Sequence, residues 1–186
     1  MAMKLKDLNK YLDKLGGKVV NRASAKAINR ALTTARKEAT KIVRERYKLK
    51  SGDIKKLLDI EKAKANNKSV FDFGGRLTIK DKPIGLEKYG ARHKRVKTGR
   101  GLRRGVTVNI TGRRVLVQGG FMAKGKVWKR KGPSRLPIKR LFGPSAAQVL
   151  EHKPTLKRLR KLGEARYREE FSRELAYQLQ RRSGGR

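Results

Sequence analysis

Two long stretches of the chain have the hydrophobic spacing of amphipathic helices. Residues 18–48 contain no Gly or Pro, and alanine recurs there at every fourth position from Ala23 to Ala39. Residues 155–181 carry Leu, Tyr and Phe mostly at three- and four-residue steps, from Leu156 to Leu179. Apolar positions at this spacing share one helix face. We therefore predict two long helices, and we interpret the alanine ridge as core packing rather than as a contact between subunits.

Shorter helices are expected around these two. Residues 3–15 place leucines at three- and four-residue steps, and the glycine pair that follows would end that helix. A Ser-Gly-Asp sequence at 51–53 is typical of a chain break and N-cap, so a short helix is predicted over residues 53–59. Ser145 is predicted to cap a further short helix that ends at Glu151.

Between residues 60 and 150 the spacing changes to the alternation that is typical of strands. Residues 106–110 and 115–118 alternate and are joined by a Thr-Gly-Arg-Arg turn, which is the clearest β-hairpin in the chain. A second strand pair is predicted around Gly125, and another around the glycine pair at 74–75. The predicted fold class is α+β, with the long N-terminal and C-terminal helices packed on a small antiparallel β-sheet with long basic loops.

The chain length suits one domain. Of its 186 residues, 37% are hydrophobic, which is enough for a modest core. Within this domain we distinguish an N-terminal helical part over residues 1–60, the sheet with its basic loops over 61–150, and the C-terminal helix over 151–186.

The formal net charge of +37 changes this picture from a small α+β domain to a polyanion-binding candidate. The charge comes from 52 Lys and Arg against 15 Asp and Glu. Residues 76–150 hold 21 basic and 2 acidic residues, and between Lys88 and Leu150 there are 18 Lys or Arg and no carboxylate. A charge this large repels itself, and nearby residues of the same segment offer no neutralisation. Nucleic acid or an acidic protein assembly is therefore the expected partner.

Two basic segments, 91–104 and 129–140, are the best candidates for this contact. The first has few apolar residues and several glycines, so we expect an exposed, mobile loop, and the second is expected to form a basic turn. Aromatic residues are sparse nearby, which favours contact with the phosphate backbone over base readout. The predicted DNA- or partner-binding residues are Arg92, Lys94, Arg95, Lys97, Arg100, Arg103, Arg104, Lys129, Arg130, Lys131, Arg135, Lys139 and Arg140.

The sequence offers little for catalysis, so we expect no enzyme activity, no metal and no cofactor. It has no Cys, and its two His residues lack a neighbouring ligand at a metal spacing. Residues 120–127 nearly match the phosphate-binding loop G-x-x-x-x-G-K-[ST], but Val127 replaces the hydroxyl that would hold Mg²⁺. The carboxylates that a nuclease would need, Asp72, Asp81 and Glu87, are scattered.

A membrane location is not expected either. No stretch approaches the ~20 apolar residues that span a bilayer. The first 15 residues alternate charge with leucine and contain no apolar signal-peptide core. Together with the absence of Cys, this pattern predicts synthesis in a reducing cytoplasm.

Several motifs of the chain resemble those of the phage minor tail protein Z family. The most specific is RLPIKRLFGPS at residues 135–145, which agrees at eight positions with the family's R-L-P-I-x-x-L-Y-G-P-S. The resemblance covers about residues 20–150 and a final helix of similar character. The other matching segments are Ala25–Arg36, Tyr47–Lys50, Ile60–Ala63, Pro83–Arg92, Gly105–Val108 and Gly120–Ala123.

The resemblance implies a virion component of a tailed phage that acts in tail completion at the head-proximal end. It also implies joining of tail to head, contact with other tail and neck proteins, contact with the end of the packaged DNA, and no enzymatic activity. Tail tubes are six-fold, so a homo-oligomeric ring of six copies is expected. The sequence leaves open whether the basic segments face DNA or acidic neighbouring subunits.

Two other classes of protein remain as alternatives. A ribosomal-type or other nucleic-acid-binding basic protein would have the same composition and isoelectric point of 11.4. A nuclease would require divalent metal for cleavage. The motif at residues 135–145 favours the tail protein over both.

Overall fold

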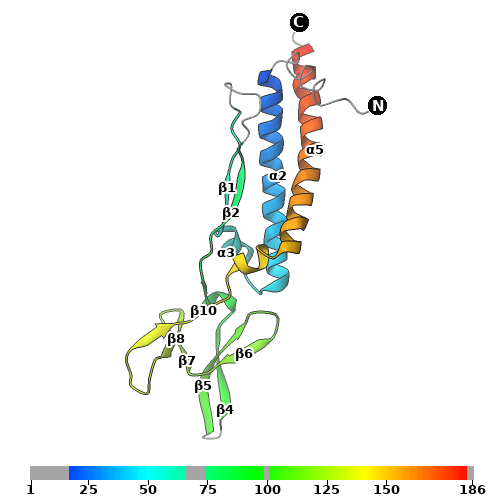
Figure 1. The fold of residues 1–186 in the computed structure, drawn as a ribbon. Helices are drawn as coiled ribbons and strands as arrows, with labels where there is room; N and C mark the ends of the chain where they lie inside the picture. Colours follow the sequence, from blue (N-terminus) through cyan, green and yellow to red (C-terminus); the bar gives the residue numbers. More distant parts are fainter. Residues whose placement is uncertain (1–16, 66–73, 99–100, 184–186) are drawn as a thin grey trace. The chain divides into compact units, whose positions relative to one another are not determined.

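Long helices lie at both ends of the described chain, and short antiparallel strands lie between them in sequence (Figure 1). The structure is a computed structural model that describes residues 17–65, 74–98 and 101–183. It confirms the α+β fold class. The predicted helix over residues 3–15 and the predicted strand over 70–73 lie outside the described residues.

The chain forms two compact units that interleave in sequence. We call the described parts of residues 1–38, 59–78 and 156–186 the helical unit, and those of 39–58 and 79–155 the sheet unit. The three-part division at residues 60 and 150 stays a prediction.

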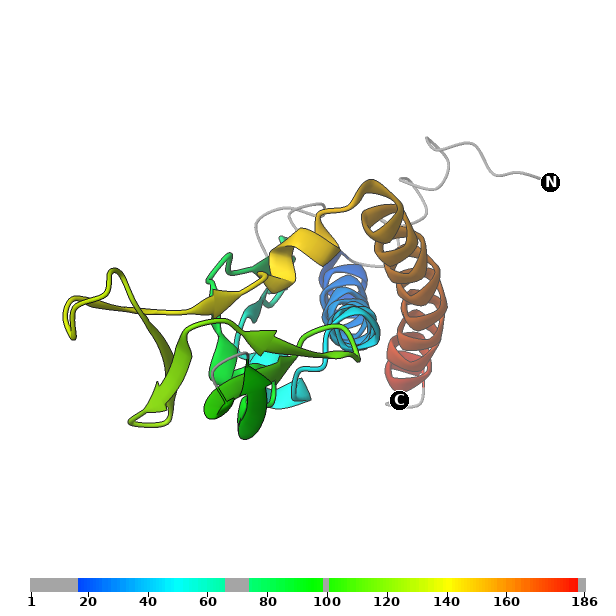
Figure 2. The same cartoon turned by 90° about the horizontal axis from the view of Figure 1, so that it is seen from below.

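The helical unit is built on two helices that run side by side in both views (Figures 1 and 2). They are α2 (Gly17–Arg46) and α5 (Lys153–Ser183), whose residues 17–38 and 156–183 belong to this unit. The strands β1 (Leu58–Glu61) and β2 (Arg76–Ile79) pair with each other. Both long helices are confirmed. The glycine predicted to end the preceding helix, Gly17, is instead the first residue of α2.

The alanine ridge of α2 packs in the core, as predicted. Ala23, Ala27 and Ala31 are buried, and the low ridge lets other segments approach the helix closely. The amide of Asn29 donates to the carbonyl of Ala63 at 3.0 Å and accepts from the Ala63 N–H at 2.8 Å. A side chain at Gly75 would lie within 2.6 Å of the Ile28 methyl group, so only glycine fits this approach.

The sheet unit contains short strands and two short helices. Its elements are α3 (Ser51–Lys55), β3 (Ile84–Gly85), the 3-10 helix η1 (Leu86–Tyr89), β4 (Arg92–Thr98), β5 (Gly101–Asn109), β6 (Arg114–Val117), β7 (Gly120–Ala123), β8 (Lys126–Arg130), β9 (Ile138–Arg140), β10 (Phe142–Gly143) and α4 (Ala146–Leu150). They form a β10-β3 pair and two three-stranded sheets, β4-β5-β6 and β7-β8-β9. All pairings in these sheets are antiparallel, and the hairpins predicted at residues 106–118 and around Gly125 are confirmed.

Tyr89 anchors the centre of the sheet unit. Its ring is fully buried, lies edge-on to Tyr47 with centroids 6.3 Å apart, and leaves no room for a side chain at Gly143. Its hydroxyl donates a hydrogen bond to the Pro144 carbonyl at 2.5 Å. Burial raises the pKa of the Tyr89 phenol well above its ordinary range. The residue therefore stays neutral and fixes the segment that leads into α4.

One short helix follows the prediction and the other does not. Ser145 caps α4, because its hydroxyl accepts from the Ala147 N–H at 3.1 Å. The short helix predicted over residues 53–59 exists, but its predicted bounds and cap are wrong: α3 begins at Ser51 and ends at Lys55, its N-cap position is Lys50, and Leu58 already belongs to β1. Burial of Leu58 and strand pairing with β2 outweigh the local helical pattern there.

The prediction of a loop over residues 91–104 is also wrong. Residues 92–98 form β4, which pairs with β5 in a continuous register from Arg92 opposite Thr107 to Thr98 opposite Gly101. The ladder needs backbone hydrogen bonds rather than apolar side chains. It is anchored at its base by Val106 and Thr107, which are buried, so a strongly basic sequence continues as a strand away from the core.

Candidate functional site

Two hairpins of the sheet unit carry the basic residues that the sequence singled out. On β4, Arg92, Lys94 and Arg95 are exposed. Arg92 and Lys94 occupy one face of the strand and Arg95 the other, because successive residues alternate. We call β4 with the paired part of β5 the first basic hairpin.

The second basic hairpin is β8 with β9 and the turn between them. Its exposed cations are Lys126, Lys129, Arg130, Lys131, Arg135 and Lys139, of which Lys126 was not among the residues predicted from the sequence. The turn is held by a hydrogen bond from the Lys131 N–H to the Pro137 carbonyl at 3.0 Å. The backbone therefore presents six exposed positive charges on one short ribbon.

The strand register places basic positions opposite each other in both hairpins. The position of Arg95 lies directly opposite that of Arg104, and Lys129 lies directly opposite Lys139. Like charges in such cross-strand pairs destabilise a sheet. Among the residues that the structure describes, no carboxylate pairs with Arg95, Lys129 or Lys139. An external anion would relieve this repulsion.

Not every predicted site residue is available to a partner in the same way. The half-buried Arg140 forms an ion pair with Glu87, and its guanidinium lies 5.0 Å from the Phe142 ring centroid. Arg140 is therefore engaged in contacts within the fold. The strands β4 and β5 include Lys97, Arg103 and Arg104, whose side chains lie outside the description, and Arg100 lies outside the described residues altogether.

An open groove of about 1110 Å³ adds basic residues that the sequence reasoning missed. Its cations are Lys41, Arg44, Lys48, Lys50 and Lys88, and its carboxylates are Glu45, Asp53 and Glu87. Two of these carboxylates already have partners, since Lys88 pairs with Asp53 and Arg140 with Glu87. The three- and four-residue spacing of Lys41, Arg44 and Lys48 was the available signal, because it puts them on one side of the helix and its extension.

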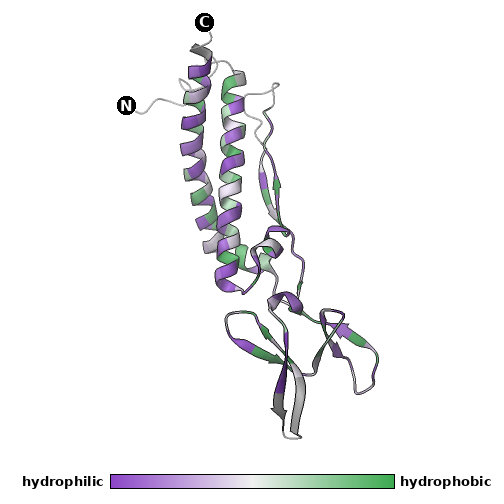
Figure 3. Cartoon of the chain, turned by 180° about the vertical axis from the view of Figure 1, so that it is seen from behind, coloured by the Kyte–Doolittle hydropathy of each residue, from purple (hydrophilic) through white to green (hydrophobic). Residues whose placement is uncertain are grey.

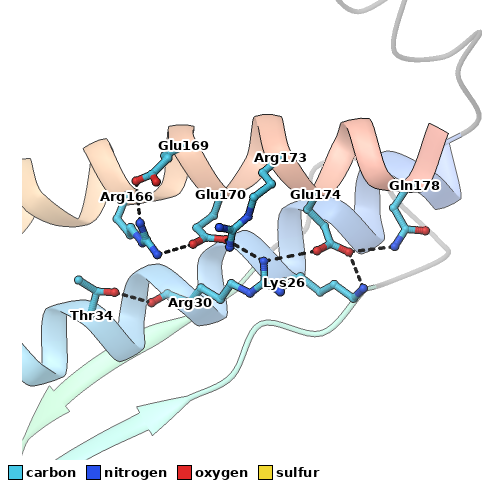
Figure 4. Close-up of polar contacts among 9 residues, drawn as sticks. All are labelled: Lys26, Arg30, Thr34, Arg166, Glu169, Glu170, Arg173, Glu174 and Gln178. Atoms are coloured by element: carbon cyan, nitrogen blue, oxygen red, sulfur yellow. Dashed lines mark hydrogen bonds and ion pairs between the residues drawn. The ribbon is translucent and has the colours of Figure 1, made fainter. Parts of the chain in front are cut away.

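The helical unit holds a different kind of charge cluster, in which the carboxylates are buried (Figure 4). Glu170 is 0% exposed. Its carboxylate contacts Arg30 of α2 at 2.7 Å, Arg166 at 2.6 Å and Arg173 at 2.5 Å. The buried positions of α5 are thus acidic. The apolar stripe predicted from Leu156 to Leu179 is only partly covered, and hydrophilic residues alternate with it (Figure 3).

Glu174 continues this cluster one turn later. Lys26 of α2 donates to its carboxylate at 2.5 Å, and Gln178 donates at 3.0 Å. Further along the same helix pair, Arg158 contacts Glu38 at 2.5 Å. The two helices are therefore joined by a row of ion pairs beside the alanine ridge, which fixes their register.

The surroundings lower the pKa of both buried carboxyl groups. For Glu170, the hydrogen bond from Arg30 is the largest cause, the charges of Arg166 and Arg173 add to it, and burial opposes it. For Glu174, burial is the largest single cause and would raise the pKa, but the hydrogen bonds from Lys26 and Gln178 and the charges of Lys26 and Arg30 together outweigh it. Both groups are ionised at neutral pH and hold the two helices together.

This lowering predicts a dependence of stability on acid. A carboxyl whose folded-state pKa is depressed stabilises the fold fully above its ordinary value of 4.5, and the contribution is lost as the pH falls through the folded pKa. We expect the stability difference between the wild type and Glu174→Gln to be constant above about pH 5 and to shrink below pH 4.5. Urea unfolding at a series of pH values measures it. Glu164→Gln, at an exposed position, should change the stability little at any pH.

The described residues contain no group of three His, Cys, Asp or Glu side chains that could hold a metal ion. No helix in the described part of the chain combines the length and apolar character that crossing a bilayer requires. The chemistry that the arrangement does support is electrostatic: exposed cations without acidic partners among the described residues on two hairpins, and a groove with more basic than acidic residues.

Comparison with known proteins places this arrangement in a biological context. A family model described as prophage minor tail protein Z matches residues 5–183. No curated protein and no solved structure matches the chain. The match includes both basic hairpins and both long helices, and agrees with the motif resemblance at residues 135–145. The chain therefore belongs to the prophage minor tail protein Z family, a family of phage tail proteins.

Proposed function

We propose that this protein is a structural tail-completion subunit at the head-proximal end of a phage tail. Several copies, six if the tail symmetry is followed, would form a ring there. The two basic hairpins would contact the end of the packaged DNA or acidic surfaces of neighbouring tail and neck proteins. The proposed role is mechanical and electrostatic, with no enzymatic step.

One observation carries this proposal: the like-charged cross-strand pairs of the basic hairpins. Lys129 opposite Lys139 is an arrangement that destabilises an isolated sheet, and it is tolerated if an anion lies against it in the assembled state. DNA supplies about one negative charge per 1.7 Å of helix axis, which is dense enough to neutralise the six exposed cations of the second basic hairpin. The buried carboxylates of the helical unit cannot serve, since each already has cationic partners.

The purified protein is expected to bind duplex DNA without sequence preference. Because release of counterions drives such binding, the affinity should fall by about 10³-fold or more between 50 and 200 mM salt if six or more phosphates are contacted. Fluorescence anisotropy with several unrelated duplexes at each salt concentration measures this. Sequence-selective or salt-insensitive binding would contradict the proposal.

The same titration separates the tail protein from the alternative of a ribosomal-type protein. A ribosomal-type protein would favour folded RNA over duplex DNA of equal charge, because RNA is recognised through shape and 2′-hydroxyl groups. For this protein we expect equal affinity for the folded RNA and for the duplex DNA. If no nucleic acid binds at low salt, the expected partner is an acidic tail protein. Binding assays with such proteins then test whether the hairpins contact protein.

A further inference from the structure

The two edges of the β4-β5-β6 sheet are protected very differently. β4 is covered with exposed cations, which is a common way to prevent unwanted strand pairing. β6 instead exposes Val115 and Leu116, whose side chains point to opposite faces of the sheet because successive strand residues alternate. The second edge therefore lacks the protection that the first one has.

Burial drops sharply between β5 and this edge. Val108 is 3% exposed, while Val115 directly opposite is 56% exposed. On the other face, Thr107 is 7% exposed and its partner Leu116 is 38% exposed. The covered surface of the sheet thus continues onto aliphatic side chains that the described chain covers only in part.

The backbone of β6 is also free on its outer side. Its backbone pairs with β5, and no other backbone hydrogen bond joins it to any residue that the structure describes. The one charged residue of β6, Arg114, does not protect this edge from strand pairing. Its guanidinium donates hydrogen bonds to the Gly90 carbonyl at 2.8 Å and to the Thr107 carbonyl at 3.3 Å. An unpaired, uncharged edge of this kind is a template for another strand.

The charge distribution indicates what that strand belongs to. Two copies of a chain with a net charge of +37 repel each other over most of their surface. Residues 115–123 form an uncharged run that includes residues 115–117 of β6 and all of β7. Copies can therefore meet at this edge with little repulsion, whereas an acidic partner would gain nothing from it.

We propose that the free edge of β6 is a self-association surface, on which a strand of a second copy of this chain pairs through main-chain hydrogen bonds. Val115 and Leu116 would then be covered by that copy. The inference rests on the proposed function, because it names the contact between the copies of the proposed ring, and it uses a surface separate from the two basic hairpins. The hairpins would stay free for DNA or acidic neighbours.

Single lysine substitutions test the surface. The full chain is studied by sedimentation velocity over a concentration series in about 0.5 M salt, where charge repulsion is screened. The wild type is expected to form oligomers, and Leu116→Lys or Val115→Lys should weaken this self-association at least tenfold. Leu136→Lys is the matched control, because Leu136 is exposed outside β6 and the substitution adds the same charge. It should associate like the wild type.

A second readout on the unmodified protein identifies the contact. Hydrogen exchange at low and high concentration should show the amides of residues 114–117 becoming protected on assembly, while those of β4 stay unchanged. A wild type that is monomeric throughout, or assembly without protection of β6, would overturn the inference. Circular dichroism melting of each variant confirms that it is folded. Failure here would leave the DNA-binding prediction standing, since that assay tests the hairpins alone.

Discussion

Replacing Glu170 with Gln is expected to lower the melting temperature by roughly 5–10 °C. The substitution keeps the shape of the side chain and removes the buried negative charge that three guanidinium groups contact at 2.5–2.7 Å. The cations on both helices are then left facing one another beside a buried site. Breaking one partner of a buried ion pair is among the most destabilising single changes known in proteins.

Glu169→Gln is the matched control for this experiment. It makes the same chemical change one position earlier, at a carboxylate that is 61% exposed and pairs only with Arg166. Surface ion pairs contribute little, so the melting temperature should shift by no more than about 2 °C. Equal shifts for the two variants would show that the buried cluster does not hold α2 and α5 together.

Reversing three charges on the first basic hairpin is expected to weaken DNA binding by roughly 100- to 1,000-fold at 100 mM salt. The variant changes Arg92, Lys94 and Arg95 to Glu together. Each phosphate contact contributes about 0.9 to the salt slope, so the loss of three contacts accounts for this range. All three side chains are exposed, and the fold should therefore be retained.

The control places the same charge change elsewhere. Lys157, Arg160 and Lys161 are exposed on α5, and reversing them to Glu alters the net charge by the same amount. Binding that depends on the position of the cations will fall much less in this control. Equal losses in the two variants would show that only total charge matters and that the hairpin is not the contact surface.

Much of the fold was predictable because it depends on local patterns. The alanines at every fourth position specify one buried face of α2, and Ser145 is the N-cap residue of α4. The hairpin between β5 and β6 has clear alternation and a turn. The first basic hairpin was not predicted, because its few apolar residues and its glycines indicated a mobile loop. Its strand is instead held by the backbone ladder and by the buried residue Val106 at its base.

The buried carboxylates could not be predicted from the spacing of α5. The apolar residues of this helix predicted a hydrophobic face, and nothing in the spacing singled out Glu170. Its main partner, Arg30, lies 140 positions away in the sequence. Only the three-dimensional structure brings the two helices into the register that buries the carboxylate, so pairing across the fold overrides the usual exposure of glutamate.

Charged residues are arranged differently in the two units. In the helical unit, acidic residues pair with Lys and Arg and hold the helices together. In the sheet unit, the exposed cations of the basic hairpins have no acidic partner among the described residues. The excess charge is therefore directed outward from two ribbons, in a chain that belongs to a phage tail protein family.

Photo-cross-linking in assembled phage particles tests this account most directly. A photoreactive residue replaces Lys94 on the first basic hairpin, and a second preparation carries it at Lys161 on α5 as the control. The account predicts that the hairpin position cross-links to packaged DNA or to an acidic tail protein, with a much higher yield than the control. Absence of a cross-link at the hairpin, or equal yields at both positions, would contradict it.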